Sequence, residues 1–86
     1  KTLKKAHGDD CFFIIDGSVI SDAMQLADAL ECMSNEVFYH HVNEFKNDFS
    51  NWVRDVLREE KLADDLMTGA TPDRCQIVVL RHILNN

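Results

Sequence analysis

Short amphipathic segments, most of them preceded by a residue that can cap a helix, constrain the fold of this chain more than any other feature. The cleanest apolar stripe follows the candidate caps Asn47 and Asp48 and consists of Phe49, Trp52, Val53, Val56 and Leu57. The stripes are separated by short connections, so neighbouring helices should pack against each other. An 86-residue chain of this kind predicts one mainly α domain, a compact bundle of about five short helices.

The ends of these helices are marked by residue type. We expect Ser21 to cap the first helix and Ser34 to cap the second, because a serine side chain accepts from the first free amides. The fourth helix should stop at Gly69, a natural residue for the left-handed position after a helix. Thr71 and Pro72 then provide the cap and first residue of a fifth helix that runs to the C-terminus.

Two further stripes define the faces of the second and last helices. The second helix is expected over residues 35–45, with one face made of Val37, Phe38, His41, Val42 and Phe45. The last helix carries a wide stripe of Ile77, Val78, Leu80, Ile83 and Leu84. We expect this stripe to be mainly core, although it is wide enough to serve a partner helix as well.

A β-hairpin is predicted before the first helix. The pair Asp16-Gly17 lies between two β-prone runs, residues 12–15 and 18–20, and Asp-Gly suits a tight turn in which both central residues have positive φ. A two-stranded hairpin is marginal alone, so it should pack on the helices. Residues 1–10 are expected to be a flexible lead-in, which leaves residues 11–86 as a single small helical domain.

The charge distribution excludes several partners. The net charge is −6, and residues 6–45 contain no Lys or Arg but eight acids, namely Asp9, Asp10, Asp16, Asp22, Asp28, Glu31, Glu36 and Glu44. Such a segment repels phosphate backbones, so nucleic-acid binding is disfavoured. The sequence also lacks an apolar run of the roughly 18 residues that a membrane span requires, and no signal peptide is evident.

The three cysteines, Cys11, Cys32 and Cys75, are odd in number and widely spaced. This favours a reducing, cytoplasmic location over a disulfide framework or a zinc knuckle. Cys75 falls in the first turn of the last helix, where the helix dipole could lower its pKa, but we expect an ordinary helix residue in preference to a nucleophile. The missing initiator Met suggests trimming or excision from a longer chain.

The stretch HHVNEFKNDFSNW raises the main functional question. Helical spacing turns His41 inward, so its ring nitrogens need hydrogen-bond partners. One interpretation is a structural lock between the second and third helices, in which His41 and Trp52 meet at a shielded corner and Asn47 or Asp48 caps the third helix. The alternative is a small polar pocket that senses a ligand or a proton; both use His41, Asn43, Asn47, Asp48 and Trp52.

Catalytic and metal-binding patterns are absent from the sequence. Glu36, His40 and Glu44 are spaced four apart on one expected helix face, but a row of this length drifts around the helix and offers one ion at most two ligands. An exposed row of ion pairs is the simpler interpretation. Phosphate-binding glycine loops and nucleophile motifs are also missing, so we expect no enzyme, no metal and no cofactor.

The stretch FYHHVNEFKNDFSNWVRDVL resembles the signature of a family of small uncharacterised helical domains found mainly in archaea and bacteria. The matching positions are Phe38, His41, Val42, Asn43, Asn47, Asp48, Phe49, Trp52, Val53, Asp55 and Val56. Members also begin with an apolar strand, a Gly turn and a short second strand, as FFIIDGSVISDAMQLADAL does. The resemblance covers residues 12–67, departs from the signature at the doubled histidine, and implies a self-contained module without a settled activity.

Together these features favour a non-catalytic module that binds another protein or a second copy of itself, a homodimer included. This hypothesis rests on the small size of the chain, its acidic N-terminal half and its surplus of apolar surface. The competing hypothesis is a ligand- or pH-sensing domain built on the polar cluster.

Overall fold

The computed structural model describes residues 4–85. Its five α-helices and an N-terminal antiparallel strand pair confirm the predicted fold class. The N-terminal part contains a 3₁₀ turn η1 (Gly8–Asp10) and the strands β1 (Phe12–Phe13) and β2 (Val19–Ile20). It is followed by α1 (Ala23–Cys32), α2 (Asn35–His41), β3 (Val42–Asn43), β4 (Lys46–Asn47), α3 (Asp48–Trp52), the π-helical turn η2 (Val53–Leu57), α4 (Glu60–Leu66) and α5 (Pro72–Asn85).

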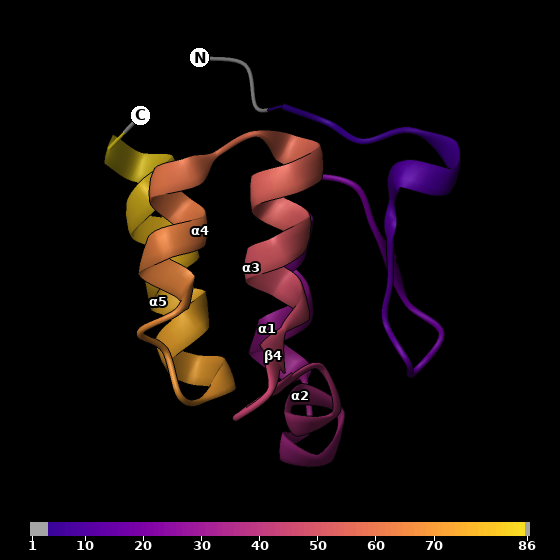
Figure 1. The fold of residues 1–86 in the computed structure, drawn as a ribbon, viewed down its shortest axis with the longest axis vertical. Helices are drawn as coiled ribbons and strands as arrows, with labels where there is room; N and C mark the ends of the chain where they lie inside the picture. The colour runs from indigo at the N-terminus through magenta and orange to yellow at the C-terminus, as the bar shows by residue number, and fades with distance from the viewer. Residues whose placement is uncertain (1–3, 86) are drawn as a thin grey trace.

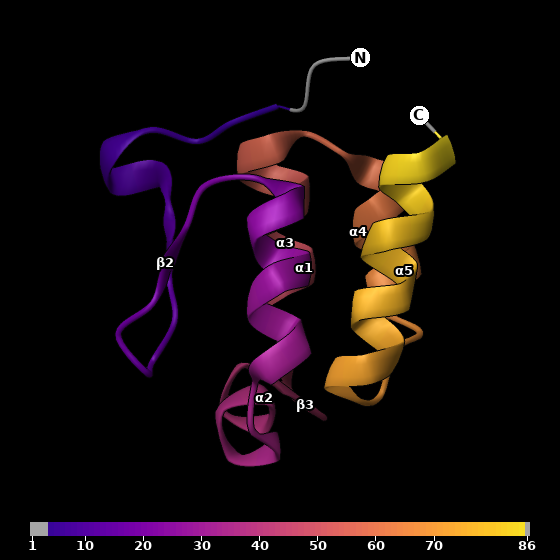
Figure 2. The ribbon, with the colours of Figure 1, turned by 180° about the vertical axis from the view of Figure 1, so that it is seen from behind.

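The helices form two layers. Figures 1 and 2 show α3 and α4 in one layer, α1 and α5 in the other, and α2 crossing at one end of α1 and α3. The β1–β2 hairpin lies beside α1 and α3, on the side opposite α4 and α5. Fully buried side chains from every helix meet between the layers, among them Leu26, Leu30, Phe38, Phe49, Val53, Leu62, Leu66 and Val79.

Three predicted helix caps are confirmed. Ser34 Oγ accepts from Val37 N at 3.2 Å, Asn47 Oδ1 from Ser50 N at 3.0 Å, and Thr71 Oγ1 from Arg74 N at 3.1 Å. Each bond satisfies an amide that the first helical turn would otherwise leave free.

The cap predicted for the first helix is wrong by one residue. Asp22, not Ser21, is the N-cap of α1, and its Oδ1 accepts from Gln25 N at 2.8 Å. Ser21 instead donates to Gln25 Oε1 from its amide at 2.7 Å and from its hydroxyl at 3.0 Å. Ser21 and Asp22 are both residue types that cap helices. Because the Ser21 hydroxyl is bonded to the Gln25 side chain, Asp22 provides the cap.

The second helix is shorter than predicted. It ends at His41, and residues 42–47 form the β3–β4 hairpin instead of another turn of helix. Asn43 Oδ1 accepts from Phe45 N at 3.0 Å, an Asx turn that competes with helical hydrogen bonding. Phe45, expected on the buried face, is 88% exposed as a result.

The N-terminal hairpin is confirmed, but its turn differs from the prediction. The paired residues are Phe12 with Ile20 and Phe13 with Val19, so the loop is longer than two residues. Gly17 N donates to Ile14 O at 2.9 Å, which makes Gly17 the last residue of the turn. Of the expected pair, Gly17 alone has positive φ, at 98°, because Asp16 Oδ1 accepts from Ser18 N at 2.8 Å and fixes a different loop.

The lead-in predicted over residues 1–10 is partly described. Residues 1–3 lie outside the described residues. Beyond them, Lys5 pairs with Asp22 in an antiparallel bridge, Ala6 is buried, and Ala6 N donates to Ser21 O at 2.7 Å. Residues 5 and 6 therefore continue the antiparallel pairing of the hairpin toward the N-terminus, opposite residues 21 and 22.

The predicted stripe of the last helix is correct only in part, since Val78, Leu80 and Ile83 are partly buried against the core. The buried residues of α5 are Pro72, Cys75 and Val79, and Val79 was not in the predicted stripe. Leu84, which was, is 83% exposed. The described helix reaches Asn85, and Asn86 lies outside the described residues. The helix turns a narrower face to α1 and α4 than its apolar sequence indicates.

Gly69 has a different role from the one predicted. The cap of α4 is Met67, and Gly69 is not among the described residues with positive φ. A Cβ at this position would lie 2.7 Å from Cys75 Sγ and 3.4 Å from Cys75 N. Gly69 is thus required by the close approach of the α4–α5 connection to α5, not by a left-handed backbone.

We expect Gly69→Ala to lower the free energy of unfolding by about 1–3 kcal/mol, because the new methyl group overpacks the buried sulfur. Chemical denaturation measures this directly. In a Cys75→Ala background the same substitution should cost clearly less. An equal cost in both backgrounds would contradict the steric explanation.

Candidate functional site

His41 is the last residue of α2, and its buried ring bridges two distant parts of the chain. Nε2 accepts from Ile15 N at 3.1 Å, and Nδ1 lies 3.0 Å from Asp48 Oδ2. Because an amide can only donate, Nε2 must present its lone pair, and the ring proton sits on Nδ1. His41 is therefore a neutral imidazole that accepts from the hairpin and donates to the start of α3.

Phe12 is the centre of the aromatic contacts around this histidine. Its ring centroid lies 5.1 Å from that of His41, 5.0 Å from that of Phe49 and 5.9 Å from that of Trp52. The arrangements with His41 and Trp52 are edge-on, a geometry that aromatic pairs favour. Ring contacts among the described residues thus link His41 to Trp52 through Phe12 of β1, which corrects the expectation that the two rings meet directly.

Trp52 anchors the other end of the hairpin. Its indole Nε1 donates to Asp10 O at 2.8 Å, and the side chain is buried. The partner of this indole is a backbone carbonyl of η1. His41 and Trp52 therefore both bind the backbone that flanks β1, one at Ile15 and one at Asp10.

Asn47 links α3 to the end of α4. Besides capping α3, its Nδ2 donates to Leu66 O at 3.3 Å. The neighbouring Ser50, which sequence reasoning missed, is fully buried and donates from Oγ to Ala63 O at 2.7 Å. A serine in a predicted apolar helix face is the signal that could have identified this contact.

Asn43 lies apart from the other four predicted residues. It is exposed, its amide Nδ2 donates to Tyr39 O at 3.3 Å, and its Oδ1 holds the Phe45 amide. The structure brings His41 and Asp48 into contact, with Asn47 directly before Asp48 in the chain and Trp52 four residues after it. Asn43 instead shapes the β3–β4 turn.

Asp48 is the charged member of the cluster. Burial opposes its ionisation, but the hydrogen bonds from Lys46 Nζ at 2.9 Å and from His41 outweigh burial and hold the pKa of Asp48 below 3.8. The carboxylate remains ionised at neutral pH. Asp48 can therefore accept from both donors at once.

No group of described residues is placed to hold a metal ion. Residues 4–85 contain no cluster of three or more His, Cys, Asp or Glu side chains placed to hold an ion. Glu44 lies in the β3–β4 turn, so the expected row with Glu36 and His40 does not form on one helix. Burial raises the pKa of Cys75 to about 11, which corrects the expectation that the helix dipole would lower it.

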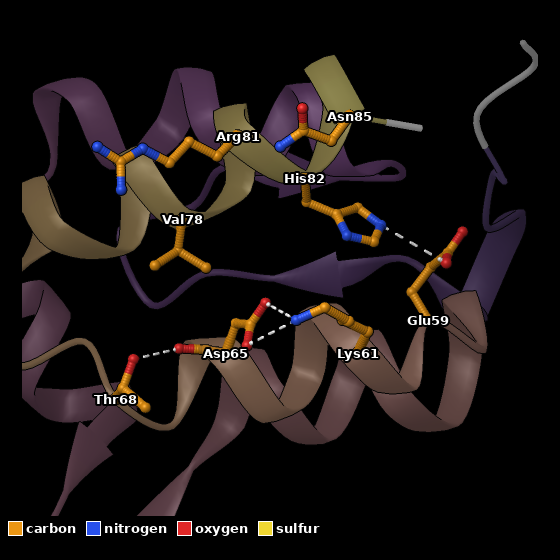
Figure 3. Close-up of a pocket in the computed structure, with 8 residues that line it drawn as sticks. All are labelled: Glu59, Lys61, Asp65, Thr68, Val78, Arg81, His82 and Asn85. Carbon is orange, nitrogen blue, oxygen red and sulfur yellow. Dashed lines mark hydrogen bonds and ion pairs between the residues drawn. The ribbon is translucent and has the colours of Figure 1, made fainter.

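A groove of about 640 Å³ lies between α4 and α5, and its charges are largely paired. Figure 3 shows His82 pointing from α5 toward Glu59, with 3.6 Å between Nε2 and Oε1, while Lys61 bonds Asp65 on the groove floor at 3.1 Å. Arg81 extends away from these pairs along α5 (Figure 3). Internal pairing leaves little unbalanced charge to attract a ligand.

Comparison with known protein families gives a match for this sequence. The match extends over residues 11–85 and is to the family of unknown function DUF5752. The chain belongs to this family. The matched residues include both the β1–β2 hairpin and the region from His41 to Trp52. No curated protein and no solved structure matches the chain. None of the helices in the described residues has the length and apolarity needed to cross a membrane.

Replacing His41 by Ala should lower the free energy of unfolding by on the order of 2–4 kcal/mol, because it removes a packed ring and leaves the Ile15 amide without its acceptor. Trp52→Phe keeps much of the ring packing, so it should cost only about 1 kcal/mol for the lost indole bond. Chemical denaturation measures both. His40→Ala, an exposed neighbour, is the matched control and should change stability by about 0.5 kcal/mol or less. If His41→Ala resembles this control, the anchoring account fails.

Acid should weaken the fold through Asp48. A carboxyl whose folded-state pKa lies below its unfolded value of 3.8 stabilises the fold above that pH, and this stability is lost as the pH falls through the folded-state pKa. Asp48→Asn should thus be less stable than the parent at neutral pH, and the difference should shrink below about pH 3.8. Denaturation at several pH values tests this, with Asp28→Asn on the exposed side of α1 as control. A difference independent of pH would contradict it.

Proposed function

We propose that this domain is a non-catalytic protein-interaction module whose contact surface is the outward face of the N-terminal hairpin. This face, called here the hairpin face, consists of Phe13, Ile15 and Val19. The three side chains are 59%, 56% and 53% exposed, and they carry the proposal because they are large, apolar and adjacent.

Strand geometry explains why these residues share one side. Phe13 and Val19 are directly paired across the strands, and paired residues point to the same face. Side chains alternate along the first strand and into the turn, so Phe12 and Ile14 pack inward while Phe13 and Ile15 face solvent. An ordinary half-buried hairpin would carry polar residues on its outer face, and this one does not.

The buried anchors hold the hairpin face ready for binding. The bond from Ile15 N to His41 and the bond from Trp52 to Asp10 O fix both ends of β1. A preordered surface loses less conformational entropy on association, which favours binding. On this proposal the polar cluster is structural, and its role is to position the hairpin.

The test compares the binding partners that the parent captures with those captured by two variants, in each of which exposed apolar side chains are replaced by serine. Phe13→Ser with Val19→Ser should fold like the parent, because both side chains face solvent, and should lose a partner that the parent captures. Leu84→Ser removes an apolar group of α5 that is even more exposed, at 83%, and should retain that partner. Retention by the hairpin variant, or equal loss by both variants, would overturn the proposal.

A second candidate function, pH sensing, is favoured by the geometry of His41. Protonation would place an N–H on Nε2, facing the N–H of Ile15, and would remove the hairpin anchor. The charged and titratable groups around the ring are Asp48, Lys46, Asp16 and His40.

NMR titration over about pH 5–8, where histidines commonly gain a proton, tests this candidate. The Ile15 amide resonance should shift together with the His41 ring and not with the His40 ring. If His41 titrates while the Ile15 amide resonance stays fixed, hairpin release is excluded.

A further inference from the structure

We infer that the partner of the hairpin face is a cationic amphipathic segment of another protein, with apolar residues flanked by Lys or Arg. This inference rests on the proposed function and adds the chemistry of the partner. Its basis is the arrangement of carboxylates around the hairpin face.

Acids lie at both ends of the hairpin face. Asp9 and Asp10 occupy η1, directly before β1, and both are exposed. Asp16 is exposed in the turn at the opposite end, next to Ile15. The hydrogen bond from Ser18 N lowers the pKa of Asp16, so this carboxylate stays charged at neutral pH. An apolar stripe thus lies between negative groups.

These three carboxylates have no cationic partner within the described residues. The N-terminal ion pairs use other acids: Lys5 Nζ lies 3.8 Å from Asp22 Oδ2, and Lys4 Nζ lies 3.8 Å from Glu59 Oε2. The sequence offers no Lys or Arg from residue 6 to residue 45. The negative potential around the hairpin face is therefore uncompensated by its own segment, and a basic partner would complement it.

The same charges disfavour other occupants of the hairpin face. A symmetric dimer through this face would set Asp9, Asp10 and Asp16 of one copy against those of another, and each chain already carries a net charge of −6. An anionic membrane surface would be repelled in the same way. A cationic segment alone gains from both the stripe and its rim.

The experiment is an NMR titration of the intact chain with two short synthetic peptides of identical apolar pattern. One peptide carries Lys at its polar positions and the other carries Glu. The Lys peptide should bind and shift the amide resonances of residues 9–20, and its affinity should fall as salt is added. The Glu peptide should bind at least about tenfold more weakly.

Two variants separate the rim from the stripe. Changing Asp9, Asp10 and Asp16 together to Asn should weaken the Lys peptide about tenfold and remove most of the salt dependence, whereas Asp28→Asn should leave both unchanged. Asn can still accept from Ser18 N at position 16, so the turn is kept. Phe13→Ser should weaken the Lys peptide without changing the salt dependence.

Equal binding of both peptides, resonance shifts outside residues 9–20, or no binding would overturn the inference. A dimer detected by sedimentation and abolished by Phe13→Ser would also overturn it, in favour of a second copy. None of these outcomes decides the proposed function, which depends on whether the hairpin variant loses its captured partner. The two proposals can therefore fail separately.

Discussion

The hydrogen bond from the Ile15 amide to His41 Nε2 decides how the N-terminal hairpin sits on the helices. It selects one tautomer of the imidazole, and that tautomer directs the Nδ1 proton to Asp48 at the start of α3. A single buried ring thus connects the hairpin, the end of α2 and the beginning of α3. The bond from Trp52 to Asp10 O holds the other end of β1, so the two bonds together fix the hairpin on the helices.

The aromatic contacts around Phe12 supply the packing that the short hairpin lacks. Two strands of two residues each cannot form a stable sheet on their own. Phe12 inserts its ring among His41, Phe49 and Trp52, so the inner face of the hairpin belongs to the core. The outer face then carries Phe13, Ile15 and Val19 without a covering element among the described residues. The inner face of the hairpin therefore contributes to stability, and its outer face is exposed to solvent.

Local signals in the sequence predicted most of the helical architecture. Ser34, Asn47 and Thr71 cap helices as expected, because each accepts from an amide three positions further on. The inward direction of His41 also followed from helical spacing. The errors arose where two local preferences compete: Ser21 against Asp22 at a cap, or the Asn43 turn against further helix. In such cases small energy differences and neighbouring contacts decide, and residue type alone does not separate them.

The sequence by itself determined three of the helix starts, the presence of the hairpin and the inward direction of His41, because these follow from the order of near neighbours. Only the tertiary structure decided that His41 binds a backbone amide 26 positions away, and that Gly69 is needed for the approach of Cys75. The physical reason is that backbone groups are the same in every residue type. A bond to a distant amide, or a steric limit set by another helix, therefore leaves no mark in the local pattern.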